Sequence, residues 1–422
     1  IVIIQLDDMR AADWSYLRKT RKLLSGAAWH PNYIIEFPRC APSRATMLTG
    51  QFSHNHGVYA PNGSFPRYEL SKLDRISMGS VLRDAGYRTG MIGKFINGYR
   101  ITDAQPGGWT RWVALSKARH FGQRMNVDGG RLDLKRTDFV GRTLALYAEE
   151  FIEETGPEQP LFLYFNPVEP HMPAEPERAF RGRFPGVAIE RDAAFNEADV
   201  SDKPSYLAAL PALTPEQVAK LDGMNRARFQ MMLSADEIIA DVIGALDRAG
   251  RMDNACIFVM SDNGMMLGHH RLIEKSLPYD RAVRVPMLAW GAPFAAGENP
   301  RLVCNADIAP TCAELAGTRM PAADGISLLG KRKRDFVPLH SNAGPDDPRT
   351  GRGLRSADLM YFEYANGERE FYDLRVDPLE LNNLLPPSYS GDLYPIGLPG
   401  TPALTLRTAS LGACRGDSCS RA

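Results

Sequence analysis

The chain has 422 residues, enough for one or two domains with a large buried core. Its 50 basic side chains balance 50 acidic ones, which excludes the strongly basic surface typical of nucleic-acid-binding proteins. No apolar run approaches the roughly 20 residues of a transmembrane helix, so we expect no membrane span. The chain begins with Ile-Val-Ile-Ile, the pattern of the middle of a strand. We therefore expect a few residues and an export signal to precede it in the full protein.

Residues 1–6 form the first predicted strand. Their apolar, largely β-branched sequence is typical of a strand buried on both faces of a parallel sheet. Asp7 and Asp8 follow directly. Because ligands bind at the carboxyl ends of strands in open α/β sheets, these two acids are candidate metal ligands, with a turn or helix cap as the simpler alternative.

Residues 40–50, Cys-Ala-Pro-Ser-Arg-Ala-Thr-Met-Leu-Thr-Gly, combine a candidate nucleophile, a rigid proline and a fixed cation. Arg44 stays charged, and its planar fork of donors suits an oxyanion ester. The residues after Arg44 are compatible with a helix, which would place the site at a helix N-terminus, where anions are favoured. Taken alone, Cys40 is better explained as a small buried core thiol, because most free cysteines are core residues.

Helices and strands alternate through the middle of the chain. Helices are predicted over residues 77–85, 137–154, 225–249 and 307–316. Strands are predicted over residues 88–93, 160–165 and 255–260. Residues 174–222 are rich in proline, alanine and charge, and we predict an insertion or lid there. Asn62-Gly-Ser64 fits an N-glycosylation acceptor, provided that the host glycosylates.

Polar groups follow each of these three strands. Lys94 comes after the first, and the second leads into a proline-rich loop that carries His171. The third ends in Ser-Asp262-Asn263-Gly, which repeats the pattern of Asp7 and Asp8. His270 and Lys275 lie in the loop beyond it.

The alternation up to about residue 335 predicts one α/β domain, with a parallel or mixed sheet and helices on both faces. Residues 341–353 have the composition of a linker. Two strands, 359–364 and 370–374, flank an Asn-Gly turn signal and predict a small antiparallel unit. We therefore divide the chain into an α/β catalytic domain over residues 1–340 and a C-terminal antiparallel subdomain over residues 354–422.

The polar residues after the strands and those of the Cys40 segment together indicate a metal-assisted hydrolase of sulfate or phosphate esters, with residue 40 as the nucleophile. The hard oxygen donors favour Ca²⁺ or Mg²⁺ over zinc, and they are Asp7, Asp8, Asp262 and Asn263. The fixed cations are Arg44, Lys94 and Lys275. His171 and His270 have side chains that titrate near neutral pH and so can transfer protons.

The six cysteines are Cys40, Cys256, Cys304, Cys312, Cys414 and Cys419. Cys414 and Cys419 have a spacing that can close a small disulfide loop, which favours export to an oxidising compartment. Cys304 and Cys312 either pair or remain as core thiols. Cys256, in an apolar strand, is expected to be inert.

The string Cys-x-Pro-Ser-Arg followed by Leu-Thr-Gly resembles the signature of the type I sulfatases, and other motifs follow in the family's order. They are Thr89 to Lys94, Pro170-His171-Met-Pro173, Ser261 to Gly264, Lys275 ahead of Val285-Pro286, and Tyr372-Asp-Leu. This resemblance covers most of the chain. It implies an alkaline-phosphatase-like mixed sheet with helices on both faces and a small C-terminal α+β subdomain.

In that family a maturation enzyme oxidises the signature cysteine to formylglycine, whose hydrate attacks sulfur and later releases sulfate to restore the aldehyde. The resemblance implies that Asp7, Asp8, Asp262, Asn263 and residue 40 hold a Ca²⁺ or Mg²⁺ ion. It implies that Arg44 and Lys94 fix the modified residue, and that Lys275 and His171 bind the sulfate. We expect His171 to protonate the leaving alcohol.

The chain departs from many arylsulfatases in one place. Ile96 stands two residues after Lys94, where those enzymes carry a histidine, and Asn97 follows. Residues 93–99 are more similar to the N-acetylglucosamine-6-sulfatase and extracellular heparan-sulfatase branch, and so is the His270-Arg271 stretch. We therefore expect Asn97 and His270 to contact substrate.

The resemblance thus implies a secreted, periplasmic or lysosome-like sulfatase acting on a sulfated sugar or an aryl sulfate. A phosphonate monoester or phosphodiester hydrolase shares the fold and can share the signature, so it remains the alternative. An inactive sulfatase-like binding protein would need a broken site, which the sequence does not show. Pocket specificity is expected from residues 100–130 and 174–222.

Overall fold

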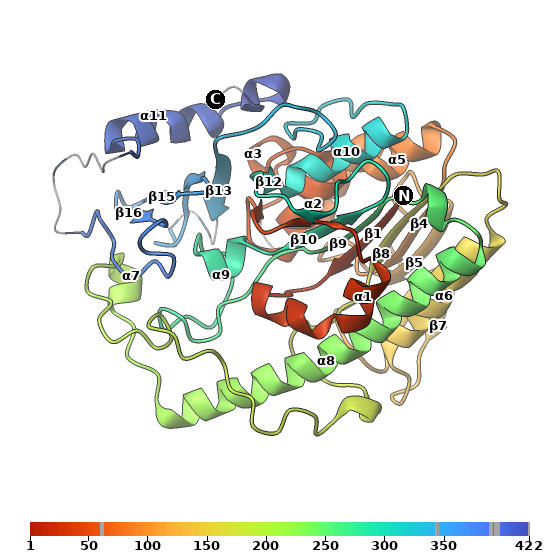
Figure 1. Ribbon diagram of the computed structural model, residues 1–422, viewed down its shortest axis with the longest axis horizontal. Coiled ribbons are helices and arrows are strands. Elements are labelled where there is room, and N and C mark those ends of the chain that lie inside the picture. Colours follow the sequence, from red (N-terminus) through yellow and green to blue (C-terminus); the bar gives the residue numbers. More distant parts are fainter. Residues whose placement is uncertain (60–62, 342–343, 345, 388–390, 392–396, 421–422) are drawn as a thin grey trace.

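The computed structural model describes residues 1–59, 63–341, 344, 346–387, 391 and 397–420. Asn62, the candidate glycan acceptor, lies outside these residues. A mixed ten-stranded sheet runs through the centre, in the order β11-β2-β10-β9-β1-β8-β4-β5-β6-β7 (Figure 1). Its strands are β1 Val2–Leu6, β2 Ala28–His30, β4 Arg88–Gly93, β5 Arg111–Leu115, β6 Arg124–Val127, β7 Gly130–Asp133, β8 Leu161–Asn166, β9 Ile257–Ser261, β10 Met287–Trp290 and β11 Gly297–Glu298.

Helices cover both faces of this sheet (Figure 1). One face packs against α6 Val140–Glu154 and α8 Pro215–Arg248, and α1 Arg18–Leu23 packs against α8. The other packs against α2 Cys40–Thr49, α4 Ser64–Leu70, α5 Met78–Asp84 and α10 Ile308–Leu315. Alternate side chains of β1 belong to opposite cores: Ile4 lies among the first group and Ile3 among the second. This explains the continuous apolar run, because a strand covered on both sides has no polar face.

The helix predicted over 225–249 begins ten residues earlier, at Pro215. Thr214 and Gln217 form a reciprocal capping box, and Pro215 takes the first helical position. Most side chains between Pro215 and Lys220 are exposed, so the first turns carry no apolar stripe for a periodicity argument to detect. The segment predicted as an insertion, 174–222, therefore ends inside α8. Before that helix it is mostly loop, with two short helical elements, η3 Arg178–Phe180 and α7 Ser205–Ala208.

A separate four-stranded antiparallel sheet follows the ten-stranded one, in the order β13-β14-β15-β16. Its strands are β13 Val337–Ser341, β14 Gly351–Arg355, β15 Leu359–Tyr364 and β16 Arg369–Asp373. The Asn-Gly turn joins β15 to β16, as the sequence indicates. β13 begins within the predicted 1–340 domain, at Val337, and β14 begins within the predicted linker, at Gly351. The small sheet therefore includes residues on both sides of the predicted domain boundary. The α/β class with a small antiparallel subdomain is confirmed.

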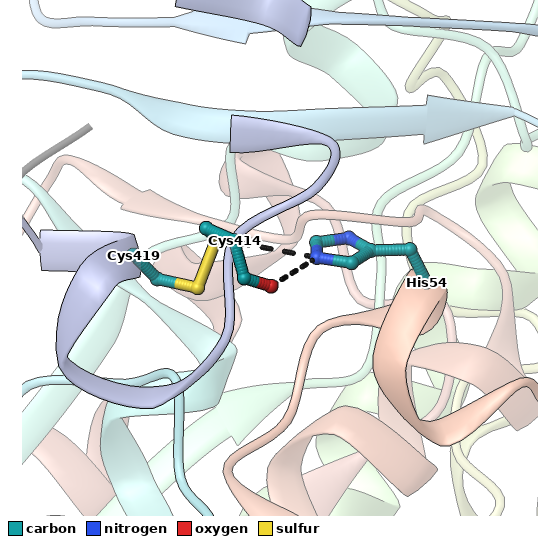
Figure 2. Close-up of side chains that lie close together, drawn as sticks. All are labelled: His54, Cys414 and Cys419. Atoms are coloured by element: carbon teal, nitrogen blue, oxygen red, sulfur yellow. Dashed lines mark hydrogen bonds between the residues drawn. A yellow bond between two sulfur atoms is a disulfide. The ribbon is translucent and has the colours of Figure 1, made fainter. Parts of the chain in front are cut away.

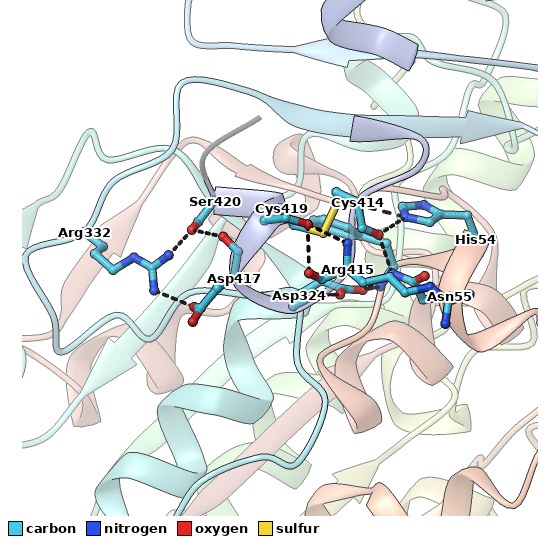
Figure 3. Close-up of a disulfide and its surroundings, with 12 residues drawn as sticks. His54, Asn55, Asp324, Arg332, Cys414, Arg415, Asp417, Cys419 and Ser420 are labelled. Atoms are coloured by element: carbon cyan, nitrogen blue, oxygen red, sulfur yellow. Dashed lines mark hydrogen bonds and ion pairs between the residues drawn. A yellow bond between two sulfur atoms is a disulfide. The ribbon is translucent and has the colours of Figure 1, made fainter. Parts of the chain in front are cut away.

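The C-terminal tail is fastened to the catalytic domain close to α2. Cys414 and Cys419 form a disulfide, and His54 of α3 Ser53–His56 places its Nε2 3.0 Å from the carbonyl oxygen of Cys414 (Figure 2). The Asp324 carboxylate accepts hydrogen bonds from the Phe52 amide at 2.8 Å and the Gly416 amide at 2.6 Å (Figure 3). The tail therefore supports the segment that follows the Cys40 helix. The other four cysteines, Cys304 and Cys312 among them, are free thiols.

A helix that spans a bilayer needs about 20 predominantly apolar residues. Within the described part of the chain, no helix is both long and apolar enough to cross a bilayer.

Candidate active site

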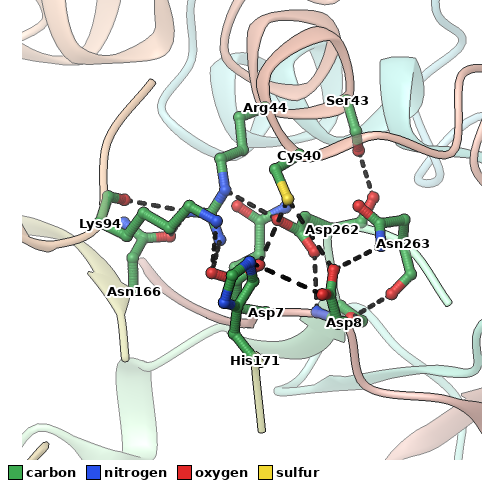
Figure 4. A network of polar contacts seen from close by, with 12 residues as sticks. Asp7, Asp8, Cys40, Ser43, Arg44, Lys94, Asn166, His171, Asp262 and Asn263 are labelled. Carbon is green, nitrogen blue, oxygen red and sulfur yellow. Dashed lines mark hydrogen bonds and ion pairs between the residues drawn. The ribbon is translucent and has the colours of Figure 1, made fainter. Parts of the chain in front are cut away.

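Four neighbouring strands, β9, β1, β8 and β4, run parallel to one another. The carboxyl ends of parallel strands meet at the same edge of a sheet, so groups that follow them converge there. The groups at these four ends are Asp262 and Asn263, Asp7 and Asp8, Asn166, and Lys94 (Figure 4). The sequence therefore specifies the site through the strands that precede its residues.

Gly93 allows two of these strand ends to approach closely. Its φ of +120° is one that other residues rarely adopt, and a Cβ atom added there would lie 2.0 Å from the Asn166 carbonyl oxygen. The Lys94 amide donates to the same carbonyl at 2.9 Å. A glycine at this position thus sets where the Lys94 side chain starts.

Cys40 is the first residue of α2, a helix whose residues are all buried. Pro42 occupies the first turn, where the backbone amides have no partner within the helix, so its missing N–H costs nothing. The Cys40 Sγ atom lies 3.4 Å from Oδ1 of Asp7 and 3.8 Å from Oδ1 of Asp8 (Figure 4). Lys275 Nζ approaches the same sulfur to 2.9 Å. The candidate nucleophile therefore faces both acids and a cation.

Three cations balance the buried acids. Lys94 forms an ion pair with Asp7, and Lys275 forms one with Asp8. The Arg44 side chain is fully buried, and its Nε donates to Asp262 at 2.9 Å.

Arg44 and its neighbour Ser43 also connect separate loops to one another. Arg44 Nη1 donates to the Lys94 carbonyl at 2.9 Å and to Asn166 Oδ1 at 3.3 Å. The Ser43 hydroxyl donates a short hydrogen bond to the Asp262 carbonyl. Asn305 Nδ2 in turn donates to Ser43 Oγ at 3.2 Å. Hydrogen bonds from two consecutive side chains therefore link the Cys40 helix to the carboxyl ends of β4, β8 and β9.

His171 completes the group from the loop after β8. Its Nε2 lies 3.8 Å from Oδ2 of Asp8, and its Nδ1 is buried with no hydrogen-bond partner among the described residues. Its carbonyl accepts a 2.9 Å hydrogen bond from His120 Nε2, which anchors the loop from behind. We call Asp7, Asp8, Cys40, Arg44, Lys94, His171, Asp262, Asn263 and Lys275 the central group.

Burial and charge set the protonation states within the central group. Burial, together with the Asp262 carboxylate, raises the pKa of the Cys40 thiol to about 12, so the thiol is protonated at neutral pH. Burial opposes ionisation of Asp7, but Lys94, His171 and Arg44 hold its pKa well below the ordinary value. Burial lowers the pKa of His171, which favours the neutral imidazole. Since thiolates, not thiols, are the reactive form, unmodified Cys40 is a poor nucleophile here.

The donors fit a hard divalent cation. Ligand atoms of Asp7, Asp8, Cys40 and Asp262 all lie within 4.8 Å of one another. Asn263 donates through Nδ2 to Asp8 Oδ1 at 2.7 Å, while its Oδ1 is buried without a partner in the described chain. Burial and the neighbouring Asp7 carboxylate raise the pKa of Asp262 to about 6, despite Arg44. An unpaired buried oxygen and an incompletely neutralised carboxylate are what a Ca²⁺ or Mg²⁺ ion would satisfy.

Two predicted site residues are not joined to the central group. His270 Nδ1 is hydrogen-bonded to Glu197 at 2.6 Å, and its ring stacks on Tyr279 with centroids 4.7 Å apart. The carbonyl of Asn97 accepts from the Phe65 amide at 3.1 Å. Among the residues that the structure describes, neither side chain is hydrogen-bonded to the central group. Their contact with substrate stays a prediction.

Sequence reasoning gave no role to Ser43, Asn166 or Asn305, which hold the central group from outside. Ser43 and Asn166 both lie inside stretches that the sequence singled out, so their position was a usable signal. Asn305 carried no signal, because its partner Ser43 is 262 residues away.

Glu169, two residues before His171, was also missed. Its carboxylate is fully buried, and neither oxygen has a hydrogen-bond partner in the described residues. Burial raises its pKa to about 7. The folded protein therefore binds this proton more tightly than the unfolded chain does, and stability falls as pH rises from about 4.5 to about 7, by about 3 kcal/mol.

We expect Glu169→Gln to abolish this fall in folding stability with rising pH. The variant should be about 3 kcal/mol more stable than the parent at pH 8 and close to it at pH 4.5, because glutamine cannot ionise. Urea unfolding at both pH values measures the difference. Glu158→Gln, at an exposed position, serves as the control. The same stability difference at both pH values would show that the Glu169 carboxyl does not titrate in this range.

Two family models match the chain. The model described as "Sulfatase" matches residues 1–318, and the one described as "N-sulphoglucosamine sulphohydrolase, C-terminal" matches residues 268–393. The first therefore includes the whole central group.

Two curated relatives are similar over most of the chain. A putative extracellular sulfatase Sulf-1 homologue of Caenorhabditis elegans is 30% identical over 78% of this chain and 48% of its own length. The chain thus spans about half the length of that relative. The N-acetylglucosamine-6-sulfatase of Capra hircus is 27% identical over 99% of this chain and 84% of its own length. The expected similarity to this branch is confirmed.

Two solved structures share the fold. A protein in complex with its substrate D-glucosamine-2-N,6-O-disulfate superposes with a TM-score of 0.76 at 21% identity, over 91% of this chain and 92% of the other. The phosphonate monoester hydrolase of Agrobacterium radiobacter superposes with a TM-score of 0.71 at 18% identity, over 91% and 90%. Identities this low establish the fold alone.

The match to the sulfatase model covers well over half of the chain and spans the residues of the central group. The chain therefore belongs to the sulfatase family, with an alkaline-phosphatase-like fold.

Proposed function

We propose that this protein hydrolyses a sulfate monoester of a sulfated sugar, with residue 40 as the nucleophile after conversion to formylglycine. The observation that carries the proposal is the position of Cys40. It starts a buried helix, faces Asp7 and Asp8 within 3.8 Å, and lies 2.9 Å from the Lys275 ammonium. A thiol with a pKa of about 12 has little use as a nucleophile there, whereas a hydrated aldehyde offers a hydroxyl.

The proposed metal is Ca²⁺ or Mg²⁺, held by Asp7, Asp8, Asp262, Asn263 and residue 40. When bound, such an ion neutralises charge on the ester oxygens and favours ionisation of the attacking hydroxyl. Two of the three Arg44 guanidinium nitrogens donate to Asp262, Asn166 and the Lys94 carbonyl, and the third, Nη2, lies 4.0 Å from Asp7. We therefore assign Arg44 to orienting the acids; its charge lowers the pKa of Asp262 but does not outweigh burial and Asp7, which raise it.

The remaining central residues bind and protonate the substrate. Lys94 and Lys275 lie beside the two acids and residue 40, so their positive charge attracts the sulfate oxygens. We assign His171 as the acid that protonates the leaving alcohol. Its imidazole is neutral in the free site, and an anionic sulfate beside it would favour the protonated form.

We propose that the alcohol is a sugar hydroxyl, that a formylglycine-generating enzyme acts on the Cys40 segment, and that the protein works in an exported compartment. The named relatives support the sugar, since one is an N-acetylglucosamine-6-sulfatase and a neighbour of the same fold binds a sulfated glucosamine. The Cys414–Cys419 disulfide and the extracellular relative support export.

Matched esters test the reaction class. We would measure kcat/KM on 4-nitrophenyl sulfate and N-acetylglucosamine 6-sulfate, and on the phosphate and phosphonate esters of the same alcohols. The sulfate esters are expected to react at least about tenfold faster, a difference of about 1.4 kcal/mol in transition-state stabilisation. Faster turnover of a phosphodiester or phosphonate would favour the alternative, which the likeness to a phosphonate monoester hydrolase keeps open.

The same esters test His171. Loss of a general acid costs roughly 10²–10⁴-fold when the leaving group is a poor one. His171→Ala should therefore slow the sugar sulfate by that factor and 4-nitrophenyl sulfate by much less. Equal losses on both esters would mean that His171 binds sulfate without donating the proton.

A further inference from the structure

Arg228, on helix α8, forms hydrogen bonds to two loops of the site, the loop after β1 and the loop that carries His171. It lies on α8, the long helix that crosses one face of the sheet (Figure 1). Its side chain is fully buried. Its Nη2 donates to the Asp8 carbonyl at 2.7 Å, and its Nη1 donates to the Pro170 carbonyl at 2.9 Å. Pro170 directly precedes His171. One planar guanidinium therefore spans a candidate metal ligand and the candidate proton donor.

Asp8 needs such support because of its backbone. Its φ of +66° lies in the left-handed region, which is costly for any residue with a Cβ and persists only where the surroundings enforce it. The Asp8 amide donates to Asp262 Oδ1 at 3.1 Å, and the Asp8 carbonyl accepts from Arg228. The peptide groups on both sides of Asp8 are thereby fixed, which aims its carboxylate at Cys40 and at His171 (Figure 4).

Arg228 is itself fixed by a buried charge network. Its Nη2 also donates to Asp13 Oδ2 at 2.7 Å, and Asp13 is fully buried. Arg10 Nη2 donates to the other oxygen of Asp13 at 2.8 Å and to Asn225 at 2.7 Å, one helical turn before Arg228. Arg10 follows Asp8 by two residues, so the loop after β1 and the helix α8 share one network.

We propose that Arg228 is a positioning residue for catalysis, which holds Asp8 in its left-handed conformation and sets the His171 loop at a fixed distance from it. The inference rests on the proposed function, since it concerns the same Asp8 and His171. Arg228 reaches only backbone oxygens of the site, so its effect is exerted through them. Lysine keeps the charge beside Asp13 but has no planar fork to reach two carbonyls at once.

The test compares Arg228→Lys with Arg226→Lys. Arg226 is on the same helix, and its Nη1 donates at 3.2 Å to the Val187 carbonyl, away from the site. Ca²⁺ affinity is measured by calorimetry on chelator-treated protein, alongside kcat, KM and the unfolding temperature. Outer partners of metal ligands are typically worth about 10- to 100-fold. Arg228→Lys is expected to lose this much in Ca²⁺ affinity and in kcat, with KM changed less, whereas Arg226→Lys should stay within about twofold.

A lower unfolding temperature for Arg228→Lys, with Ca²⁺ affinity and kcat equal to those of Arg226→Lys, would overturn the proposal. If Arg228→Lys does not fold, Asp13→Asn serves instead. It keeps both carbonyl bonds but weakens the group that orients the guanidinium, so a fall of about threefold to tenfold in Ca²⁺ affinity is expected and an unchanged affinity would count against us. Weakened Ca²⁺ binding in Arg228→Lys, in a protein that hydrolyses no sulfate ester, would uphold the positioning role and reject the proposed function.

Discussion

Replacing Cys40 by alanine is expected to abolish sulfate ester hydrolysis, with kcat reduced by about 10⁴-fold or more. Removal of a covalent nucleophile leaves only the contribution of binding and electrostatic groups. The variant should still fold, because Cys40 is the first residue of α2. The hydrogen bonds of Ser43 and Arg44 to the neighbouring loops do not involve the Cys40 sulfur. Turnover of 4-nitrophenyl sulfate, with unfolding in urea as the check on folding, measures the effect.

Cys256→Ala provides the matched control. Cys256 is a free, half-buried thiol one residue before β9, at the opposite end of that strand from Asp262. Its removal should leave kcat unchanged. If Cys40→Ala kept more than a tenth of the parent activity, residue 40 could not be the nucleophile.

Removal of divalent ions is expected to have the second-largest effect. Three buried acids, Asp7, Asp8 and Asp262, lie close together, and burial keeps the pKa of Asp262 raised even with Arg44 and Lys94 nearby. Chelation should therefore lower kcat by at least about 100-fold, the scale of several kcal/mol that metal ions supply in ester hydrolysis. It should also destabilise the fold, by about 2.7 kcal/mol relative to protein in Ca²⁺ at 100 times its dissociation constant.

Addition of Ca²⁺ or Mg²⁺ should restore both properties, whereas sodium chloride at matched ionic strength should not. Asp262→Asn should no longer show the ion-dependent rise in unfolding temperature. Full turnover in excess chelator would contradict the assignment of the metal site.

The proximity of several residues of the central group was predictable because they follow strong local sequence patterns. Asp7 and Asp262 each come after an apolar strand, and parallel strands end at one edge of a sheet, so their proximity follows from the sequence alone. Cys40 and Arg44 share one helical turn, so their proximity to each other follows as well. For these residues, local sequence determines position.

The supporting residues were not predictable, because their role depends on contacts between distant segments. Arg228 contacts the Asp8 carbonyl across 220 residues, and no periodicity in α8 distinguishes it from Arg226. The first turns of α8 were missed for a related reason, since a helix that projects into solvent lacks an apolar stripe. The predicted substrate contacts of Asn97 and His270 came from likeness to one branch of the family, and they stay predictions.

The chemical identity of residue 40 in the mature protein is the most direct test of the sulfatase mechanism. Trypsin cleaves after Arg39 and Arg44, which releases a peptide of residues 40–44. Mass spectrometry of active protein from its native host should show this peptide with the thiol replaced by an aldehyde that reacts with a hydrazide. An unmodified cysteine throughout a fully active preparation would contradict the mechanism.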